Sequence, residues 1–348
     1  MSDIHIRKSG KAGRITFTRP KALNAMSYEM CMAIGAAMRV WANDDEVELV
    51  VIDAEGEKAF CAGGDIAELY DTGAKGEYTY GRRFWRDEYR LNARIFEYQK
   101  PVISFMQGFT MGGGVGIGCH GTHRVVGGTS QIAMPEVGIG LVPDVGGTLM
   151  LALAPGRLGE YLGLTAARMG SDDAILAGFA DYFIPEARWP ELIADLETNG
   201  RAAVVEDAAE AAPEGRLRTQ QDAINRHFGG ETLTDIRNSL ATDESEFAAA
   251  ARKAMGRNSP LSMACTVEML HRLRGEGLTI RKALDMEYRF TFRAMEKGDF
   301  LEGIRAQIID KDRNPQWQYA GQDVPAAAVS QMLMPLGADA LTFEEETA

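Results

Sequence analysis

The sequence contains few residues of some kinds, and each shortage excludes a class of protein. It has four cysteines among 348 residues: Cys31, Cys61, Cys119 and Cys265. None of them forms a Cys-x-x-Cys pair, which excludes a zinc-ribbon or thioredoxin-type motif. Four scattered thiols are typical of small buried hydrophobic side chains in a reducing compartment.

Long hydrophobic runs are also absent. No apolar stretch reaches the roughly 18 residues that a membrane-spanning helix needs. Residues 1–11 contain Asp3 and no apolar core segment, which argues against a signal peptide. We therefore expect a cytoplasmic protein without a membrane partner.

Basic side chains are outnumbered by acidic ones. The chain has 37 lysines and arginines against 50 aspartates and glutamates, which gives a formal net charge of −13. Nucleic acids and anionic membranes are bound through an excess of basic groups, so neither is an expected partner. The hydrophobic fraction of 45% is that of an ordinary globular protein with a sizeable core.

Short apolar strands that alternate with helices indicate an α/β core over residues 1–185. Residues 4–7 and 14–18 alternate as in a β-hairpin, and Ser27 can cap a helix that runs to about Ala42. Strands that alternate with helical segments predict crossover connections. Further strands are expected at residues 48–53, 102–106, 124–126 and 131–134.

The pattern after residue 185 is almost purely helical. Residues 186–320 are expected to form a helical C-terminal region, since no convincing strand follows residue 184. The Ala-rich, acidic stretch 321–348 is expected to be a loosely held, flexible tail. The expected helices cover residues 219–229, 233–240, 245–255, 260–274 and 279–297.

Glycine, by contrast, is abundant and clustered. Most of the interest lies in three clusters, at residues 61–65, 112–118 and 138–147. Glycine permits strained backbone and close approach, so two such loops at strand ends could direct N–H groups at one oxygen. Tight turns and close helix packing explain the same glycines, and the spacing alone favours this simpler explanation.

Two motif matches do not predict a site. Residues 116–121 fit the G-x-G-x-x-G pattern of dinucleotide sites, but they fall inside a helix expected near Gly113 rather than directly after a strand. His120 and His123 have a metal-like spacing without a third ligand nearby in sequence, so no metal site is expected. The P-loop and the G-x-S-x-G patterns are absent.

Two carboxylates, Glu136 and Asp144, lie among apolar residues and glycines. A short glycine-containing loop joins them, so they could face one cavity. Burial raises a carboxyl pKa and neighbouring carboxylates push their pKa values apart, which suits general acid–base catalysis or nucleophilic attack. Capping explains Asp144 equally well, because a helix is expected to begin near Val145, and Glu136 could be an ordinary loop acid.

These motifs, in this order, resemble the crotonase (enoyl-CoA hydratase/isomerase) superfamily. Residues 58–66 resemble its first oxyanion-hole segment, residues 108–114 its second, and residues 134–147 the segment that carries catalytic acids. The resemblance implies a crotonase-like (ClpP/crotonase) fold, a spiral of ββα units, with a mainly helical C-terminal region. It also implies an acyl-CoA substrate and a possible homo-oligomer, since relatives are often trimers or hexamers.

One position separates the branches of this superfamily. Its hydratases carry a second glutamate two residues after the Gly-Gly-Gly run, and this chain has Gly116 there. Several segments instead resemble the 3-hydroxyisobutyryl-CoA hydrolase branch, which implies hydrolysis of a 3-hydroxyacyl-CoA thioester in valine catabolism. These segments are residues 84–89, 134–144, 286–289 and 299–312.

The resemblance assigns roles residue by residue. The backbone N–H groups of Gly64 and Gly113 would hold the thioester oxygen as it becomes negative. Glu136 would attack the carbonyl carbon or activate water, and the resemblance leaves that choice open. Asp144 would orient the acyl group or water and share in proton transfer, and Glu88 would bind the 3-hydroxyl of the substrate.

Coenzyme A carries phosphate charges that an acidic chain must offset locally. Lys21 and Lys58 are the candidate cations, together with Lys311 and Arg313, although ordinary surface charge explains each of them better. The resemblance also places the backbone around Ala62, Asp65 and Ile66 against the adenine. No separate cofactor is expected, because the coenzyme A thioester is the substrate.

Two other interpretations stay open. An enoyl-CoA hydratase or isomerase could work with Glu136 alone. The same scaffold could also bind acyl-CoA without catalysis, although acids buried in apolar loops are costly and a mere binder gains nothing from them.

Overall fold

The computed structural model describes residues 3–275 and 277–343, and the chain divides into two compact units. The units interleave along the chain and do not follow the predicted division near residues 185 and 320. Each unit is described by itself. Unit 1 comprises Met1–Asp65, Arg90–Ala133 and Arg168–Arg218, and unit 2 comprises Ile66–Tyr89, Met134–Ala167 and Thr219–Ala348.

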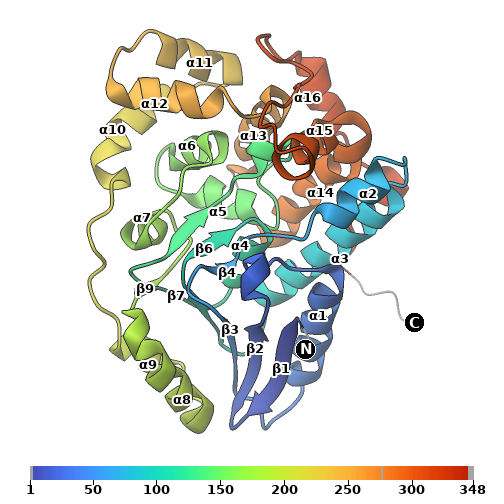
Figure 1. The fold of residues 1–348 in the computed structure, drawn as a ribbon. Helices are drawn as coiled ribbons and strands as arrows, with labels where there is room; N and C mark the ends of the chain where they lie inside the picture. The colour runs from blue at the N-terminus through green and yellow to red at the C-terminus, as the bar shows by residue number, and fades with distance from the viewer. Residues whose placement is uncertain (1–2, 276, 344–348) are drawn as a thin grey trace. The chain divides into compact units, whose positions relative to one another are not determined.

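Unit 1 is built on a six-stranded sheet with the order β1-β2-β3-β5-β7-β9 (Figure 1). β1 (Ile4–Ser9) and β2 (Ala12–Phe17) form the predicted antiparallel hairpin, and the other neighbours pair in parallel. Parallel pairing requires crossovers, which confirms the α/β expectation. The remaining strands are β3 (Leu49–Ala54), β5 (Val102–Met106), β7 (His123–Val126) and β9 (Tyr182–Phe183).

Helices cover this sheet and complete the core of unit 1. α1 (Tyr28–Ala42) begins where predicted, because the Ser27 hydroxyl accepts the Met30 N–H at 3.2 Å. Trp189 and Leu196 of α8 (Trp189–Asn199) and Val205 of α9 (Ala203–Asp207) pack with the apolar side chains of β2, β3, β5 and β7. The four cysteines are buried and unbridged, as expected.

A second, three-stranded parallel sheet in unit 1 carries two of the glycine clusters. Its strands are too short for an alternating pattern, and only β8 is predicted from the sequence. α4 (Gly113–Gly118) follows β6 and begins where the sequence indicates. The strands lie in the order β4 (Ala59–Cys61), β6 (Phe109–Met111) and β8 (Gln131–Ala133).

Unit 2 contains helices, and no strand lies in its described residues. All five helices predicted after residue 218 are present, with bounds that differ from the prediction by a few residues. They are α10 (Leu217–His227), which begins in unit 1, α11 (Leu233–Ala241), α12 (Glu246–Met255), α13 (Pro260–Leu273) and α14 (Ile280–Lys297). Other helices of unit 2 are α2 (Ala67–Gly73), α3 (Thr79–Phe96), which ends in unit 1, α5 (Gly147–Leu153), α6 (Leu158–Thr165) and α15 (Phe300–Ile304).

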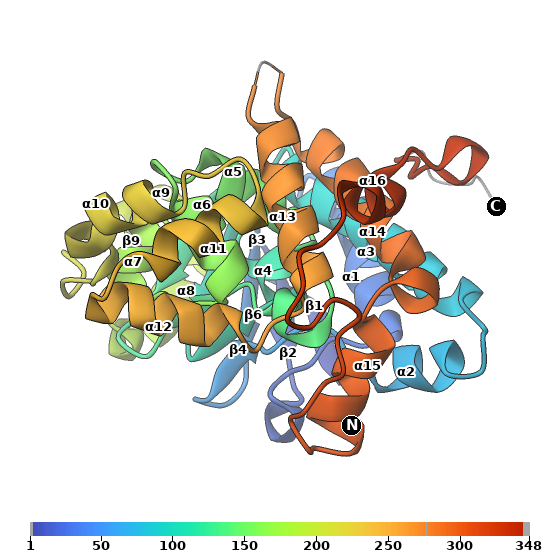
Figure 2. The same ribbon diagram turned by 90° about the horizontal axis from the view of Figure 1, so that it is seen from above.

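The expectation of a loosely held tail from residue 321 is wrong for α16 (Ala326–Leu333). α16 packs against α13 and α14 (Figure 2), with Met332 and Leu333 buried. Arg293 of α14 donates from Nη1 to the Met332 carbonyl at 3.0 Å. Burial of these apolar side chains holds the segment, and residues 344–348 lie outside the described residues. Over the described part of the chain, no helix combines the length and the apolar character needed to cross a membrane.

Candidate functional site

Four carboxyl groups of unit 2 are buried close together. Glu88 and Glu136 are each 4% exposed, Asp144 is 5% exposed and Glu287 is fully buried. The negative charges of the other three acids all raise the pKa of Glu136, so they share one electrostatic environment. Burial of so many acids is costly, and it is typical of a functional site rather than of an ordinary core.

The four acids come from distant parts of the chain. Glu88 lies on α3, and Glu136 is the first residue of the short 3-10 helix η2 (Glu136–Ile139). Asp144 lies in the loop before α5, and Glu287 lies in the middle of α14. The structure thus brings together the three predicted acids and adds a fourth.

Glu136 and Glu88 each keep one carboxyl oxygen without a partner. Glu136 Oε2 and Glu88 Oε1 are buried and make no hydrogen bond with any described residue. Burial is the main cause that raises the pKa of each well above its usual range, and the charge of Asp144 adds to it. Each group therefore has a carboxyl oxygen to offer to a substrate or a water.

Asp144 is oriented by a hydrogen bond rather than used as a helix cap. The Tyr89 hydroxyl donates to Asp144 Oδ2 at 2.8 Å. Helix α5 begins at Gly147 with Gly146 as its N-cap and no side-chain cap, so the capping interpretation of Asp144 is wrong. Burial raises the pKa of Asp144 to about 7, and the Tyr89 hydrogen bond opposes that rise. Such a pKa suits proton transfer at neutral pH.

The sequence analysis gave no role to Glu287 and Tyr89, although both lie in segments that carry the family resemblance. Glu287 accepts hydrogen bonds from the backbone N–H groups of Gly146 at 2.8 Å and Thr148 at 3.0 Å, and from the Thr148 hydroxyl. Burial raises its pKa to about 8. An acid on the buried face of an amphipathic helix is the signal that could have found it. That face includes Ala283, Leu284, Tyr288, Phe290 and Thr291.

The predicted oxyanion donors lie on two neighbouring loops of unit 1. β4 and β6 are parallel, so the loops that follow them leave the same edge of the sheet. The start of α4 also lies against the end of β4, because a Cβ at Gly114 would lie 2.1 Å from the Cys61 carbonyl oxygen. Within the described residues, the N–H groups of Gly64 and Gly113 donate to no protein acceptor. Neither N–H group is therefore used by the protein itself, which is one requirement of an oxyanion donor.

The residues proposed to contact coenzyme A are divided between the units: Lys21, Lys58, Ala62 and Asp65 belong to unit 1, and Ile66, Lys311 and Arg313 belong to unit 2. Lys21, on the short 3-10 helix η1 (Pro20–Ala22), and Lys58, just before β4, have exposed side chains. Asp65 pairs with Arg19, whose Nη2 lies 3.2 Å from Asp65 Oδ2, so the loop already contains a cation that the sequence analysis did not identify. The Ala62 N–H donates to the Leu23 carbonyl at 3.0 Å and is occupied within the protein.

The two histidines singled out from the sequence are packing residues. His120 is buried and meets the Phe96 ring edge-on, with 5.9 Å between centroids. His123 stacks on Tyr182 at 5.7 Å. No cluster of three potential metal ligands occurs among the described residues.

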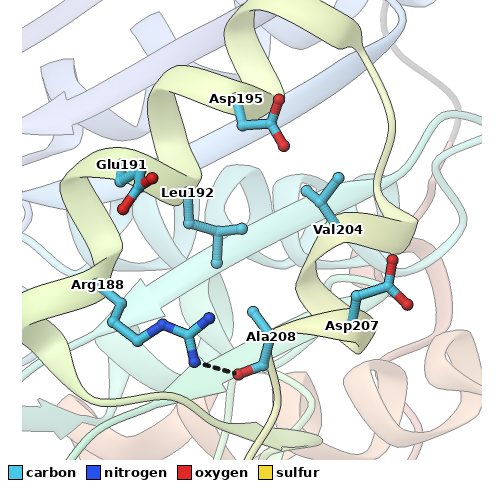
Figure 3. A pocket seen from close by; sticks show the side chains of 7 residues that line it. All are labelled: Arg188, Glu191, Leu192, Asp195, Val204, Asp207 and Ala208. Carbon is cyan, nitrogen blue, oxygen red and sulfur yellow. Dashed lines mark hydrogen bonds between the residues drawn. The ribbon is translucent and has the colours of Figure 1, made fainter.

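None of the predicted site residues lines an open pocket of unit 1. It has a volume of about 480 Å³ and lies between α8 and α9 (Figure 3). Arg188 at its edge donates to the Ala208 carbonyl at 3.2 Å and to Glu210, so its cation is already engaged. Acidic side chains dominate the remaining polar lining, which is the wrong charge for coenzyme A.

Comparisons with known proteins cover nearly the whole chain. Residues 12–333 match the family model of enoyl-CoA hydratase/isomerase. Among curated relatives, the mitochondrial 3-hydroxyisobutyryl-CoA hydrolase of Gallus gallus is 37% identical over 97% of this chain and 90% of the relative. The human protein of the same name is 36% identical over 98% of this chain and 91% of its own. The expected cytoplasmic location gains no support from these mitochondrial relatives and stays a prediction.

Two solved structures resemble the chain over its full length. An enoyl-CoA hydratase from Rhodobacter sphaeroides 2.4.1 is 58% identical with a TM-score of 0.94, covering 98% of this chain and all of the other. A carnitinyl-CoA dehydratase from Mycobacterium thermoresistibile is 38% identical with the same TM-score, covering 99% of this chain and all of the other. These matches confirm the expected crotonase-like fold.

Proposed function

This chain belongs to the enoyl-CoA hydratase/isomerase family, and we propose that it hydrolyses the thioester of a 3-hydroxyacyl-CoA, above all 3-hydroxyisobutyryl-CoA. Water and the thioester would give 3-hydroxyisobutyrate and free coenzyme A, a step of valine breakdown. Relatives named for this reaction, which are 36–39% identical to the chain, support the choice of substrate. Water is the second reactant, so the proposal requires no separate cofactor.

The observation that carries the proposal is the set of acids buried in unit 2. Glu136 and Glu88 each have an unpartnered oxygen, and Asp144 has a pKa of about 7. Position 116, where a hydratase carries its second glutamate, is a buried glycine inside α4. The chain thus has the acids for hydrolysis and lacks the side chain for the usual two-glutamate hydration.

The carboxyl of Glu136 would perform the central step. In one route its oxygen attacks the thioester carbon, the thiolate leaves, and water opens the resulting anhydride. In the other route it removes a proton from the water that attacks the same carbon. Both routes require the ionised form, and Asp144, whose pKa of about 7 suits proton exchange, would return a proton to the departing thiolate.

The negative charge on the thioester oxygen would be held by backbone groups. The N–H groups of Gly64 and Gly113 are the proposed donors, and removal of one such donor typically raises a barrier by about 2.7–4 kcal/mol. The phosphates of coenzyme A would be offset by Lys21 and Lys58, with its adenine near Ala62, Asp65 and Ile66. These assignments rest on the family resemblance and on the N–H groups of unit 1 that the protein itself does not use.

Glu88 would select the substrate. A buried carboxyl with an unpartnered oxygen can bond the 3-hydroxyl, and an analogue without that hydroxyl leaves the acid unpaired. We therefore expect 3-hydroxyisobutyryl-CoA to be preferred over isobutyryl-CoA by roughly 10⁴-fold in kcat/KM. Glu88→Leu has no polar side-chain atom for the hydroxyl and should remove most of this preference, whereas Glu191→Leu, on an exposed acid of α8, should leave it unchanged.

A second candidate function is hydration of an enoyl-CoA with Glu136 alone. The relative from Rhodobacter sphaeroides, 58% identical and called an enoyl-CoA hydratase, favours it. Thiol release from 3-hydroxyisobutyryl-CoA and loss of enone absorbance from crotonyl-CoA should be measured on the same enzyme. Thiol release that exceeds hydration supports the proposed hydrolase, and the reverse result contradicts it. Binding of both compounds without turnover would indicate an acyl-CoA-binding protein.

A further inference from the structure

Glu287 takes no part in the steps above, although it is the most deeply buried acid of the cluster. Its carboxyl accepts three hydrogen bonds, and all three donors belong to the turn just after Asp144. Gly146 N–H donates to Oε2 at 2.8 Å, and Thr148 N–H donates to Oε1 at 3.0 Å. The Thr148 hydroxyl also donates to Oε1.

The turn that Glu287 holds is conformationally strained. Val145 has φ 54° and Gly146 has φ 82°, so two successive residues occupy the left-handed region. A β-branched residue such as Val145 adopts that region only at a cost, and surrounding contacts must maintain it. The three hydrogen bonds to Glu287 supply such contacts directly after Asp144.

The same helix also supports the side chain of Asp144. Thr291 lies one turn beyond Glu287 on α14, and its Oγ1 is 3.4 Å from the Tyr89 hydroxyl. That hydroxyl donates to Asp144 Oδ2 at 2.8 Å. Helix α14 therefore braces the backbone of the Asp144 loop through Glu287 and its carboxyl through Thr291 and Tyr89.

We propose that Glu287 is a positioning residue, which fixes the 144–148 turn through its three hydrogen bonds and thereby sets the orientation of Asp144 for the reaction. We call these three hydrogen bonds the Glu287 clamp. Its effect on turnover rests on the proposed function, but the clamp itself lies entirely within unit 2. It extends the active-site support to a helix of the C-terminal region, far along the chain from the catalytic motifs.

The decisive variant is Glu287→Gln. Glutamine has nearly the same shape but offers one oxygen and one NH₂ group, so one of the two backbone N–H groups must face another donor. We expect kcat for 3-hydroxyisobutyryl-CoA to fall by about 100-fold with little change in KM, because a small misplacement of a catalytic group has that cost. Glu296→Gln, on an exposed acid of the same helix, is the matched control and should leave kcat unchanged.

Hydrogen exchange separates this inference from the proposed function. In Glu287→Gln the amides of Gly146 and Thr148 should exchange at least 10-fold faster than in the wild type, while amides elsewhere in α13 keep their rates. This measurement needs no substrate. Wild-type protein without thioesterase activity would refute the proposed function alone, and unchanged exchange at both amides would refute the clamp.

A second pair of variants keeps the inference testable if Glu287→Gln does not fold. Thr148→Val removes the hydroxyl that donates to Glu287 and retains the shape, whereas Thr148→Ser retains the hydroxyl. We expect kcat to fall about 5-fold in Thr148→Val and to return close to the wild-type value in Thr148→Ser, again at constant KM. Equal kcat values for Thr148→Val and the wild type would overturn the inference.

Discussion

The proposed donors of unit 1 are backbone N–H groups, whereas the proposed acids of unit 2 are side chains. In unit 1 the two glycine loops follow adjacent parallel strands, and the start of α4 lies so close to the end of β4 that Gly114 has no room for a Cβ. In unit 2 the carboxyls of Glu88, Glu136 and Asp144 are buried side chains, and Asp144 also accepts a hydrogen bond from the Tyr89 hydroxyl. The proposed backbone donors of unit 1 therefore depend on the conformation of the glycine segments. The acids of unit 2 depend on the side chains that surround them.

This difference predicts different responses to mutation. A backbone donor cannot be deleted by an isosteric side-chain substitution, so it must be tested by steric displacement of its loop. A carboxyl can be neutralised in place, so its charge and its proton can be tested without a change of shape. The predictions below apply these two kinds of change, from the largest expected effect to the smallest.

Neutralisation of Glu136 should have the largest effect. Glu136→Gln removes the nucleophile or base and should lower kcat for 3-hydroxyisobutyryl-CoA by about 10³-fold, as measured by thiol release. Glu191→Gln is the matched control, on an exposed acid of α8. Comparable rates for Glu136→Gln and the control would show that another group carries the central step.

Displacement of the glycine loops should have the next largest effect. In Gly114→Ala the new Cβ would lie 2.1 Å from the Cys61 carbonyl oxygen, so the start of α4 must move away from the end of β4. We expect kcat to fall by about 10²-fold, the typical cost of one lost oxyanion donor, with circular dichroism that shows a folded chain. Gly170→Ala, at a glycine of unit 1 with open space around it, is the control. Wild-type kcat in folded Gly114→Ala would refute the importance of this close approach.

The glycine loops and two of the acids could be predicted from the sequence, because each lies within a short continuous motif. The glycine loops, Glu136 and Asp144 occur in continuous motifs, so a short pattern identifies them. The hairpin, α1 and the late helices were also predicted, because each carries its own periodicity or cap. The strands β4 and β6 were missed because three residues are too few to show an alternation.

The partners of the acids could not be predicted in the same way. Glu287 follows Asp144 by more than a hundred residues, and its hydrogen bonds go to backbone groups that no side-chain pattern marks. Tyr89 adjoins Glu88, yet only the fold reveals that its hydroxyl reaches Asp144. The assembly of each compact unit from separate segments of the chain is likewise not visible in a local pattern.

Removal of the Tyr89 hydroxyl should have a moderate effect on rate and a clear effect on pH dependence. The hydrogen bond from Tyr89 stabilises ionised Asp144, so its loss raises the pKa of Asp144 above about 7. In Tyr89→Phe, the limb of the pH–kcat profile that reports this group should move to higher pH, with kcat at pH 7 lowered about 10-fold. Tyr288→Phe, which removes a hydroxyl bonded to the Arg82 carbonyl, should not move that limb. A profile for Tyr89→Phe that coincides with the wild type would exclude Asp144 from proton transfer.

The smallest predicted effect is on the free energy of unfolding. It tests the buried acids without a catalytic assay. Asp144 has a pKa of about 7 in the folded chain against an ordinary value of 3.8, and Glu287 has a pKa of about 8 against 4.5. At these two groups the folded state binds more protons than the unfolded state between about pH 4 and pH 8, so their contribution to the free energy of unfolding falls as the pH rises through this range. Asp144→Asn removes one of these protonation sites and should flatten the fall in urea-denaturation experiments, whereas Asp222→Asn, on an exposed acid of α10, should not. Gly170→Ala changes no titratable group, so it should retain the wild-type pH slope. If the free energy of unfolding of Asp144→Asn falls with pH as steeply as that of the wild type, protonation of Asp144 does not contribute to the pH dependence of stability.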